Sequence, residues 1–170
     1  MRRFLGGALT AALLAMATMA PALAHKSSDS YLSLCVKGKE ITGQWDIALR
    51  DLDFVLKLDD DGDGNITWSE LRRHQADITA YAFDYLKVST DRGACSISPG
   101  RQMVDSHADG AYAALFFDIV CVGAATTITL DYRLFFAIDP SHRGILVLHS
   151  GNSIATSLLS PENARIELNP

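Results

Sequence analysis

Apolar and polar positions alternate near the start of the chain in a pattern that predicts a β hairpin. Over 31–36 every second side chain is apolar, which is typical of a strand with one buried face. Lys37-Gly38-Lys39 then predicts a turn, and a second, longer strand follows it. The alternating positions of that second strand are Ile41, Gly43, Trp45, Ile47 and Leu49.

A helical pattern replaces this alternation after residue 50. Asp51 is a suitable N-cap for a short helix over 52–58. A longer helix is predicted from Thr67 to about Lys87, because its apolar residues fall on one stripe. These residues are Leu71, Ile78, Ala82 and Tyr85. The predicted helical unit therefore covers residues 51–87.

The second half of the chain returns to short strands. The candidate strands are 95–98, 111–121, 126–138, 144–149, 153–160 and 164–168. Turn signals such as Ser98-Pro99-Gly100, Asp109-Gly110 and Gly151-Asn152 separate them. Many short strands at this spacing predict a mainly β fold, either a sandwich or a partly open barrel. The helical unit is then an insertion between the first hairpin and the remaining strands.

Residues 1–24 have the composition of a cleaved signal peptide. A basic start, Met1-Arg2-Arg3, precedes an almost wholly apolar stretch, and Ala22-Leu23-Ala24 supplies a cleavage site. We therefore expect a single extracytoplasmic β domain over 25–170, in a periplasmic or secreted protein. No later stretch is long and apolar enough to predict a membrane span.

Composition and motifs argue against two classes of function. The 170-residue chain carries a formal net charge of −5 and has no basic patch, so we expect no nucleic-acid partner. It also lacks the H-E-x-x-H motif of metalloproteases and the G-x-S-x-G motif of α/β hydrolases. Since no pairing of a nucleophile with a base is visible either, the sequence predicts a protein that is not an enzyme.

Three cysteines bear on the fold. Export places them in an oxidising compartment, where two can pair and one is left over. Cys95 and Cys121 flank adjacent predicted strands, so we predict a disulfide between them and a free Cys35. The pairings of Cys35 with Cys95 or with Cys121 stay open, because connectivity cannot be read from sequence.

Residues 59–70 carry the strongest candidate chemistry. They match the calcium-loop pattern D-x-[DN]-x-[DN]-G-x5-E at every defined position. Calcium takes about six to eight oxygen ligands, and this segment offers carboxylates, a carbonyl and a hydroxyl. Gly64 at position 6 permits the sharp turn that the loop requires. The predicted ligands are Asp59, Asp61, Asp63, the carbonyl of Asn65, Thr67 (directly or through water) and Glu70.

A simpler interpretation is a solvated acidic turn in which Thr67 and Glu70 form only a capping box. It does not account for the aspartates, whose carboxylates repel one another unless a cation lies among them. No second calcium loop is expected. Asp105 to Gly110 matches part of the pattern, but Phe116 would stand at its last ligand position, and Asp109-Gly110 favours a hairpin turn.

Residues 59–70 and their flanks resemble the EF-hand family. A longer resemblance runs from His25 to about Tyr85 and is clearest over 25–34 and 43–53. It is to the extracytoplasmic N-terminal region of bacterial HupE/UreJ-type membrane proteins, which are nickel-linked accessory proteins of hydrogenases or ureases. The transmembrane helices and transport residues of that family are absent here. The resemblance therefore implies an exported domain with an EF-hand-like loop, compatible with a membrane or periplasmic protein partner, and does not imply nickel transport.

The predicted function is that of an exported calcium-binding protein whose single loop acts mainly as a structural clamp. The alternative is a soluble nickel- or copper-binding accessory protein. In that case His25, as the first residue after cleavage, binds the metal through its amine and imidazole. A further ligand would come from His107, His142 or His149 if the fold brings one of them close.

Overall fold

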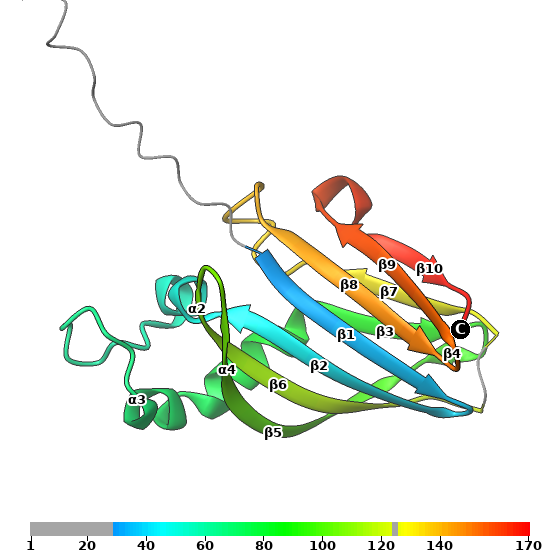
Figure 1. The fold of residues 1–170 in the computed structure, drawn as a ribbon, viewed down its shortest axis with the longest axis horizontal. Coiled ribbons are helices and arrows are strands. Elements are labelled where there is room, and N and C mark those ends of the chain that lie inside the picture. Colours follow the sequence, from blue (N-terminus) through cyan, green and yellow to red (C-terminus); the bar gives the residue numbers. More distant parts are fainter. Residues whose placement is uncertain (1–28, 124–125) are drawn as a thin grey trace, which may run out of the picture.

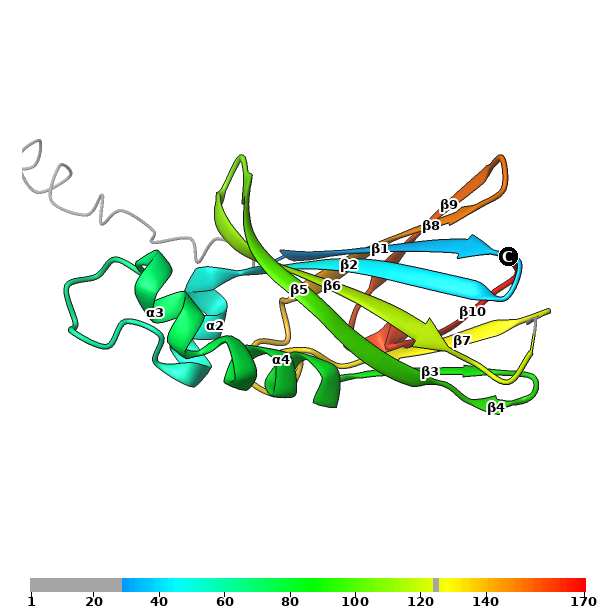
Figure 2. The ribbon, with the colours of Figure 1, turned by 90° about the horizontal axis from the view of Figure 1, so that it is seen from below.

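Two β sheets face each other and enclose the core of the protein (Figures 1 and 2). The structure is a computed structural model that describes residues 29–123 and 126–170. The six-stranded sheet has the order β5 (Ser96–His107), β6 (Gly110–Val120), β2 (Glu40–Ala48), β1 (Asp29–Lys37), β8 (Arg143–Ser150) and β9 (Ser153–Leu159). The four-stranded sheet has the order β10 (Arg165–Leu168), β7 (Ile128–Tyr132), β3 (Leu86–Thr90) and β4 (Gly93–Ala94). The predicted mainly β fold is confirmed, and neither sheet closes into a barrel within the described residues.

The predicted first hairpin is confirmed. β1 and β2 pair antiparallel up to Lys37 and Glu40, so Gly38 and Lys39 form a two-residue turn. Gly38 has a φ of +63°, a conformation in which glycine carries no steric penalty. On its other side β1 pairs with β8 in parallel. This pairing joins strands that are far apart in the chain, and the local sequence pattern does not predict it.

The helical unit begins earlier than predicted. β2 runs directly into α2 (Leu49–Leu56), so Ala48 occupies the N-cap position and Asp51 lies in the first turn. The prediction of Asp51 as the N-cap is therefore wrong. The reason is that Leu49 is buried in the core as part of the helix, together with Leu52.

The predicted long helix is two helices, α3 (Trp68–Arg73) and α4 (Gln75–Asp84), which meet at His74. Thr67 caps α3, as expected from the sequence. The predicted end at about Lys87 is wrong, because Leu86 begins β3 and pairs with Tyr132 of β7. Burial of every second residue along β3 in the four-stranded sheet overrides the local helical pattern.

Two predicted strands have different lengths in the structure. β5 continues through Pro99 and Gly100, which the sequence predicts as a turn, and its register shifts between Pro99 and Gln102. Proline is tolerated there because β5 is an edge strand and needs no amide donor on its outer side. The predicted strand over 126–138 ends as β7 at Tyr132, since the Arg133 N–H bonds the Tyr85 carbonyl at 2.8 Å.

The core lies between the sheets and continues beneath the helices. Leu52 of α2 and Ile78 of α4 are fully buried within the same cluster as the inward residues of both sheets. Gly43 of β2 leaves room for the ring of Phe117 on β6, because a Cβ at Gly43 would lie 2.2 Å from that ring. Phe117 in turn packs edge-on against Phe83 of α4, with ring centroids 5.1 Å apart.

The predicted disulfide between Cys95 and Cys121 is confirmed, and Cys35 is a free thiol. Cys95 lies between β4 and β5 and Cys121 directly follows β6, so the bond continues the pairing of β5 with β6 beyond Ser96 and Val120. In the part of the chain that the structure describes, no helix is both long enough and apolar enough to cross a membrane.

Candidate functional site

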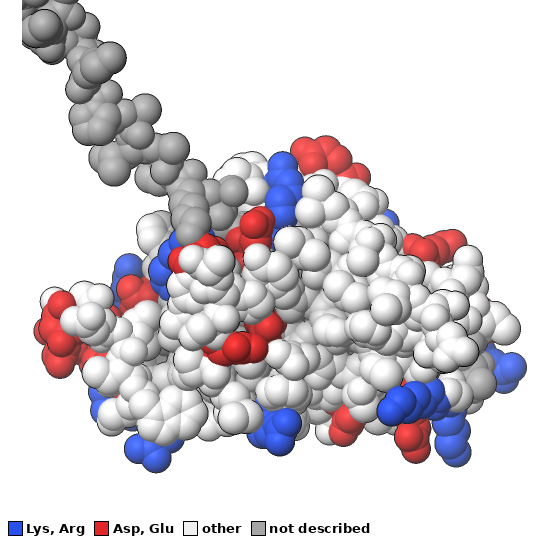
Figure 3. Space-filling model, viewed as in Figure 1, with Lys and Arg blue, Asp and Glu red and all other residues white. Residues whose placement is uncertain are grey.

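The acidic loop between α2 and α3 brings three predicted ligands together. The carboxylate oxygens of Asp59, Asp61 and Asp63 lie within 4.8 Å of one another. The loop projects from one end of the molecule, away from the strand ends that carry the disulfide (Figure 1). Acidic side chains gather at this same end in the space-filling view (Figure 3). Carboxylates at this separation repel each other, and a divalent cation among them removes that repulsion.

Backbone amides give the loop its shape. The carboxylate of Asp59 accepts hydrogen bonds from the N–H groups of Gly62 and Gly64, both at 2.8 Å. These glycines have φ values of +73° and +84°, a region that glycine adopts without steric penalty, and Gly64 is the glycine that the calcium-loop pattern requires. The Asn65 N–H donates to Asp63 at 2.7 Å. The amide of Gly64 is also the main reason that the pKa of Asp59 lies below its ordinary value.

The neighbouring carboxylates affect the pKa of Asp61. The hydrogen bond from the Asp63 N–H lowers the pKa of Asp61, but repulsion from the carboxylates of Asp63 and Glu70, together with desolvation, outweighs it. The net result is a pKa above the ordinary value for aspartate. The loop therefore concentrates negative charge that the side chains around Asp61 do not neutralise.

Glu70 connects the two ends of the loop. Its side chain is only 2% exposed, and its Oε1 accepts from the Asp60 N–H at 3.0 Å. Its Oε2 accepts from the N–H and the hydroxyl of Thr67, at 2.8 and 2.7 Å. The capping box is therefore present, and the Thr67 hydroxyl is the main cause of the lowered pKa of Glu70. Thr67 and Glu70 thus form a capping box, and the aspartates also cluster, so the two interpretations do not exclude each other.

The sequence pattern does not predict the contacts that hold the loop against the helices. Asp60, at the one acidic position with no predicted ligand role, accepts from Arg73 at 2.6 and 2.8 Å and contacts His74 Nε2 at 2.9 Å. The hydrogen bond with His74 lowers the pKa of Asp60 and raises that of His74. Asp53 of α2 accepts from the Asp59 N–H at 3.0 Å. Asp53 reaches the loop from α2, Arg73 from the last residue of α3, and His74 from the junction of α3 and α4.

Within the described residues, the histidines named as further ligands for the alternative function form no common cluster. His25 lies outside the described residues. His107 contacts Asp46, whereas the Nε2 of His142 lies 2.6 Å from the Tyr132 hydroxyl oxygen and His149 is on β8. Within the described ranges, neither group of candidate metal ligands contains more than one histidine.

The chain matches no protein-family model, and a search of curated proteins also finds no match. The resemblances to EF-hand proteins and to the HupE/UreJ-type outer domain therefore remain predictions.

Proposed function

We propose that this protein is an exported calcium-binding protein and that residues 59–70 form its EF-hand-type site. The observation that carries the proposal is the convergence of the Asp59, Asp61 and Asp63 carboxylates on a backbone already arranged by amide hydrogen bonds. The Asn65 carbonyl, Thr67 and Glu70 complete the proposed ligand set. Oxygen ligands of this kind suit a hard cation such as Ca²⁺.

Export is part of the proposal. A disulfide between Cys95 and Cys121 is stable in an oxidising compartment and rare in the reducing cytoplasm. The signal-peptide composition of residues 1–24 agrees with this location, although that segment lies outside the described residues. Millimolar extracellular calcium is also compatible with a site of modest affinity.

We further infer that calcium acts as a clamp and not as a switch. The helices α2, α3 and α4 already bury Leu52, Leu71 and Ile78, respectively, in the core. Opening the unit would expose these side chains at a cost of roughly 1.5–3 kcal/mol each. Sensor EF-hands open a groove rich in methionine, whereas the only methionine among the described residues, Met103, lies on β5 outside the helical unit.

Calcium-dependent stability tests the proposed site. At about one hundred times its dissociation constant, calcium should add about 2.7 kcal/mol to the free energy of unfolding. Magnesium should add less, because it demands a tighter octahedral shell. Asp61→Asn should reduce the calcium effect, because it removes one negative charge from the site while it keeps a side-chain oxygen. It should change the apo protein little, since Asp61 is exposed and the structure shows one backbone hydrogen bond to its side chain.

Asp84→Asn is the matched control, because it makes the same change of charge at an exposed position of α4 outside the loop. It should respond to calcium like the wild type. Equal melting temperatures in calcium and in chelator, or an undiminished calcium effect in Asp61→Asn, would contradict the proposed site.

Amide hydrogen exchange separates a clamp from a switch. A clamp should increase protection mainly over residues 49–84, which contain α2, the loop, α3 and α4. Calcium-induced changes throughout β5 to β10, or an apolar surface that binds a dye only with calcium, would identify a switch instead.

A further inference from the structure

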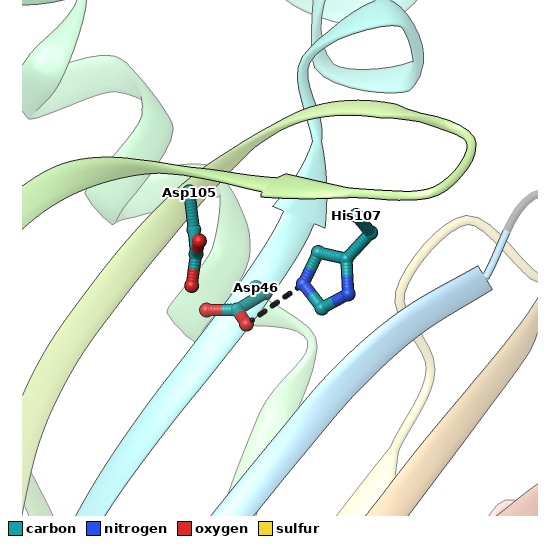
Figure 4. A group of neighbouring side chains, drawn as sticks. All are labelled: Asp46, Asp105 and His107. Carbon is teal, nitrogen blue, oxygen red and sulfur yellow. Dashed lines mark hydrogen bonds and ion pairs between the residues drawn. The ribbon is translucent and has the colours of Figure 1, made fainter.

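A second cluster of ligand-type side chains lies at the outer surface of the six-stranded sheet. Asp46 on β2 meets Asp105 and His107 on β5, and their candidate ligand atoms lie within 4.8 Å of one another (Figure 4). The ring nitrogen Nε2 of His107 is 3.1 Å from Oδ2 of Asp46. Asp105 and His107 are two residues apart on one strand, so both side chains point to the same face.

β6 lies between β2 and β5 in the sheet, so the side chains of the cluster must meet across it. Small residues on β6 make this possible. β6 places Ala114 opposite Asp46 and Gly110 opposite His107. Neither of these two residues has a side chain large enough to fill the space above β6. Tyr112, which lies between them opposite Asp105, packs against the His107 ring. The tip of the β5–β6 hairpin also curls away from the plane of the sheet on the outer side (Figure 2). The side chains of two strands that are not neighbours therefore meet across β6.

The two inner members of the cluster are held in position. Asp46 is only 6% exposed, and its Oδ1 accepts from the Gln44 side-chain N–H at 2.9 Å, which leaves Oδ2 facing His107. The His107 ring stacks on Tyr31 with centroids 4.3 Å apart and an interplanar angle of 3°. Tyr112 packs against the same ring edge-on, with centroids 4.4 Å apart.

The third member gives access to solvent. Asp105 is exposed, and the only hydrogen bond shown to its carboxylate is from the Ser106 N–H, at 2.7 Å. Its side chain can therefore approach or leave the pair formed by Asp46 and His107 without disturbing the core. An exposed ligand also leaves coordination positions that water can fill.

Charge counting favours a bound cation over a simple ion pair. A protonated His107 balances one carboxylate, but the second carboxylate within 4.8 Å then keeps its negative charge unbalanced within the cluster. A divalent ion bound by a neutral His107 balances both carboxylates. An imidazole nitrogen with two carboxylate oxygens is a mixed donor set that suits zinc and its first-row neighbours better than calcium.

We propose that Asp46, Asp105 and His107 form a binding site for a divalent transition-metal ion of the zinc type. Around a zinc ion with bonds of about 2.0–2.2 Å, tetrahedral ligands lie about 3.3 Å apart. The 3.1 Å separation of His107 Nε2 and Asp46 Oδ2 is already close to this value. Gln44 acts as a positioning residue, because it fixes the carboxylate that binds the metal. The site is separate from the calcium loop and does not depend on it.

Metal titration of the exported protein in saturating calcium tests the site. Zn²⁺ measured by calorimetry should bind at one equivalent, and Co²⁺ should show visible absorption bands that zinc then removes. His107→Gln and Asp46→Asn should each weaken zinc binding by at least about tenfold. Asp105→Asn should weaken it as well, and this exposed variant removes a ligand without altering buried structure.

Matched controls separate this site from other metal ligands. His149→Gln removes a histidine on β8 outside the cluster and should leave zinc affinity unchanged. Affinity that falls only in His25→Ala would place the metal at that histidine, and affinity that falls only in Asp61→Asn would place it in the calcium loop. Either result would overturn the proposal, as would the absence of zinc and cobalt binding at roughly 100-fold excess of metal over protein. None of these results depends on calcium binding by the loop.

Discussion

Mild acid should destabilise this protein through one buried histidine, His142. A chain of hydrogen bonds crosses the core from Trp45 Nε1 to Ser30 Oγ at 3.3 Å, from Ser30 to the Tyr132 hydroxyl at 2.7 Å, and from Tyr132 to His142 Nε2 at 2.6 Å. All four residues are buried. Since the indole N–H can only donate, the direction that uses every donor makes His142 Nε2 the final acceptor. Nε2 accepts only while it carries no proton, so this direction requires a neutral ring.

The size of the effect follows from the surroundings of His142. Its pKa is lowered from 6.5 to about 4, mainly by burial, while Asp139 opposes the shift and Arg143 adds to it. As the pH falls below 6.5, the unfolded chain takes up a proton at this residue and the folded protein does not. The free energy of unfolding therefore decreases until the pH reaches the folded pKa, and the decrease ends there. The full loss is about 3 kcal/mol, of which about 2 kcal/mol should be lost by about pH 5.

Urea unfolding at about pH 7.5 and about pH 5, in saturating calcium, measures this loss. The reference is His142→Gln, which offers an acceptor for the Tyr132 hydroxyl and does not titrate. Between these two pH values, the wild type should lose about 2 kcal/mol more than this variant. Carboxylates and His74 titrate in both proteins, so the difference isolates His142. The same loss in both proteins would refute the reasoning.

Two further predictions concern packing and the disulfide. Gly43→Ala should destabilise the fold by about 1–3 kcal/mol despite the low β propensity of glycine, because the new methyl group meets the Phe117 ring, and Phe117→Leu in the same chain should recover part of the loss in a urea titration. Replacing Cys95 and Cys121 by serine should cost roughly 3.5 kcal/mol by loop entropy, whereas Cys35→Ser should shift the urea midpoint little. Wild-type stability in Gly43→Ala, or in the variant without the disulfide, would contradict the respective prediction.

The sequence by itself determined the features that depend on residues close together in the chain. The first hairpin and the cap at Thr67 occur where the residue pattern predicts them. The turn between β5 and β6 lies at Ala108 and Asp109, one residue before the predicted Asp109-Gly110. The clustering of the loop aspartates belongs to the same class, since alternate residues in a tight loop have few ways to separate. The disulfide was predictable only as one of three pairings, selected because its two cysteines flank adjacent strands.

Only the tertiary structure decided which distant residues meet. It paired β1 with β8 in parallel, ended the long helix where Leu86 enters a sheet, and turned Arg73 and His74 onto Asp60. It also placed Asp46 against His107, 61 residues away in the chain. The physical reason is that local geometry depends on a few backbone torsions, which residue types report directly. A long-range contact instead depends on the total burial and hydrogen bonding of whole sheets, and no short segment contains that information.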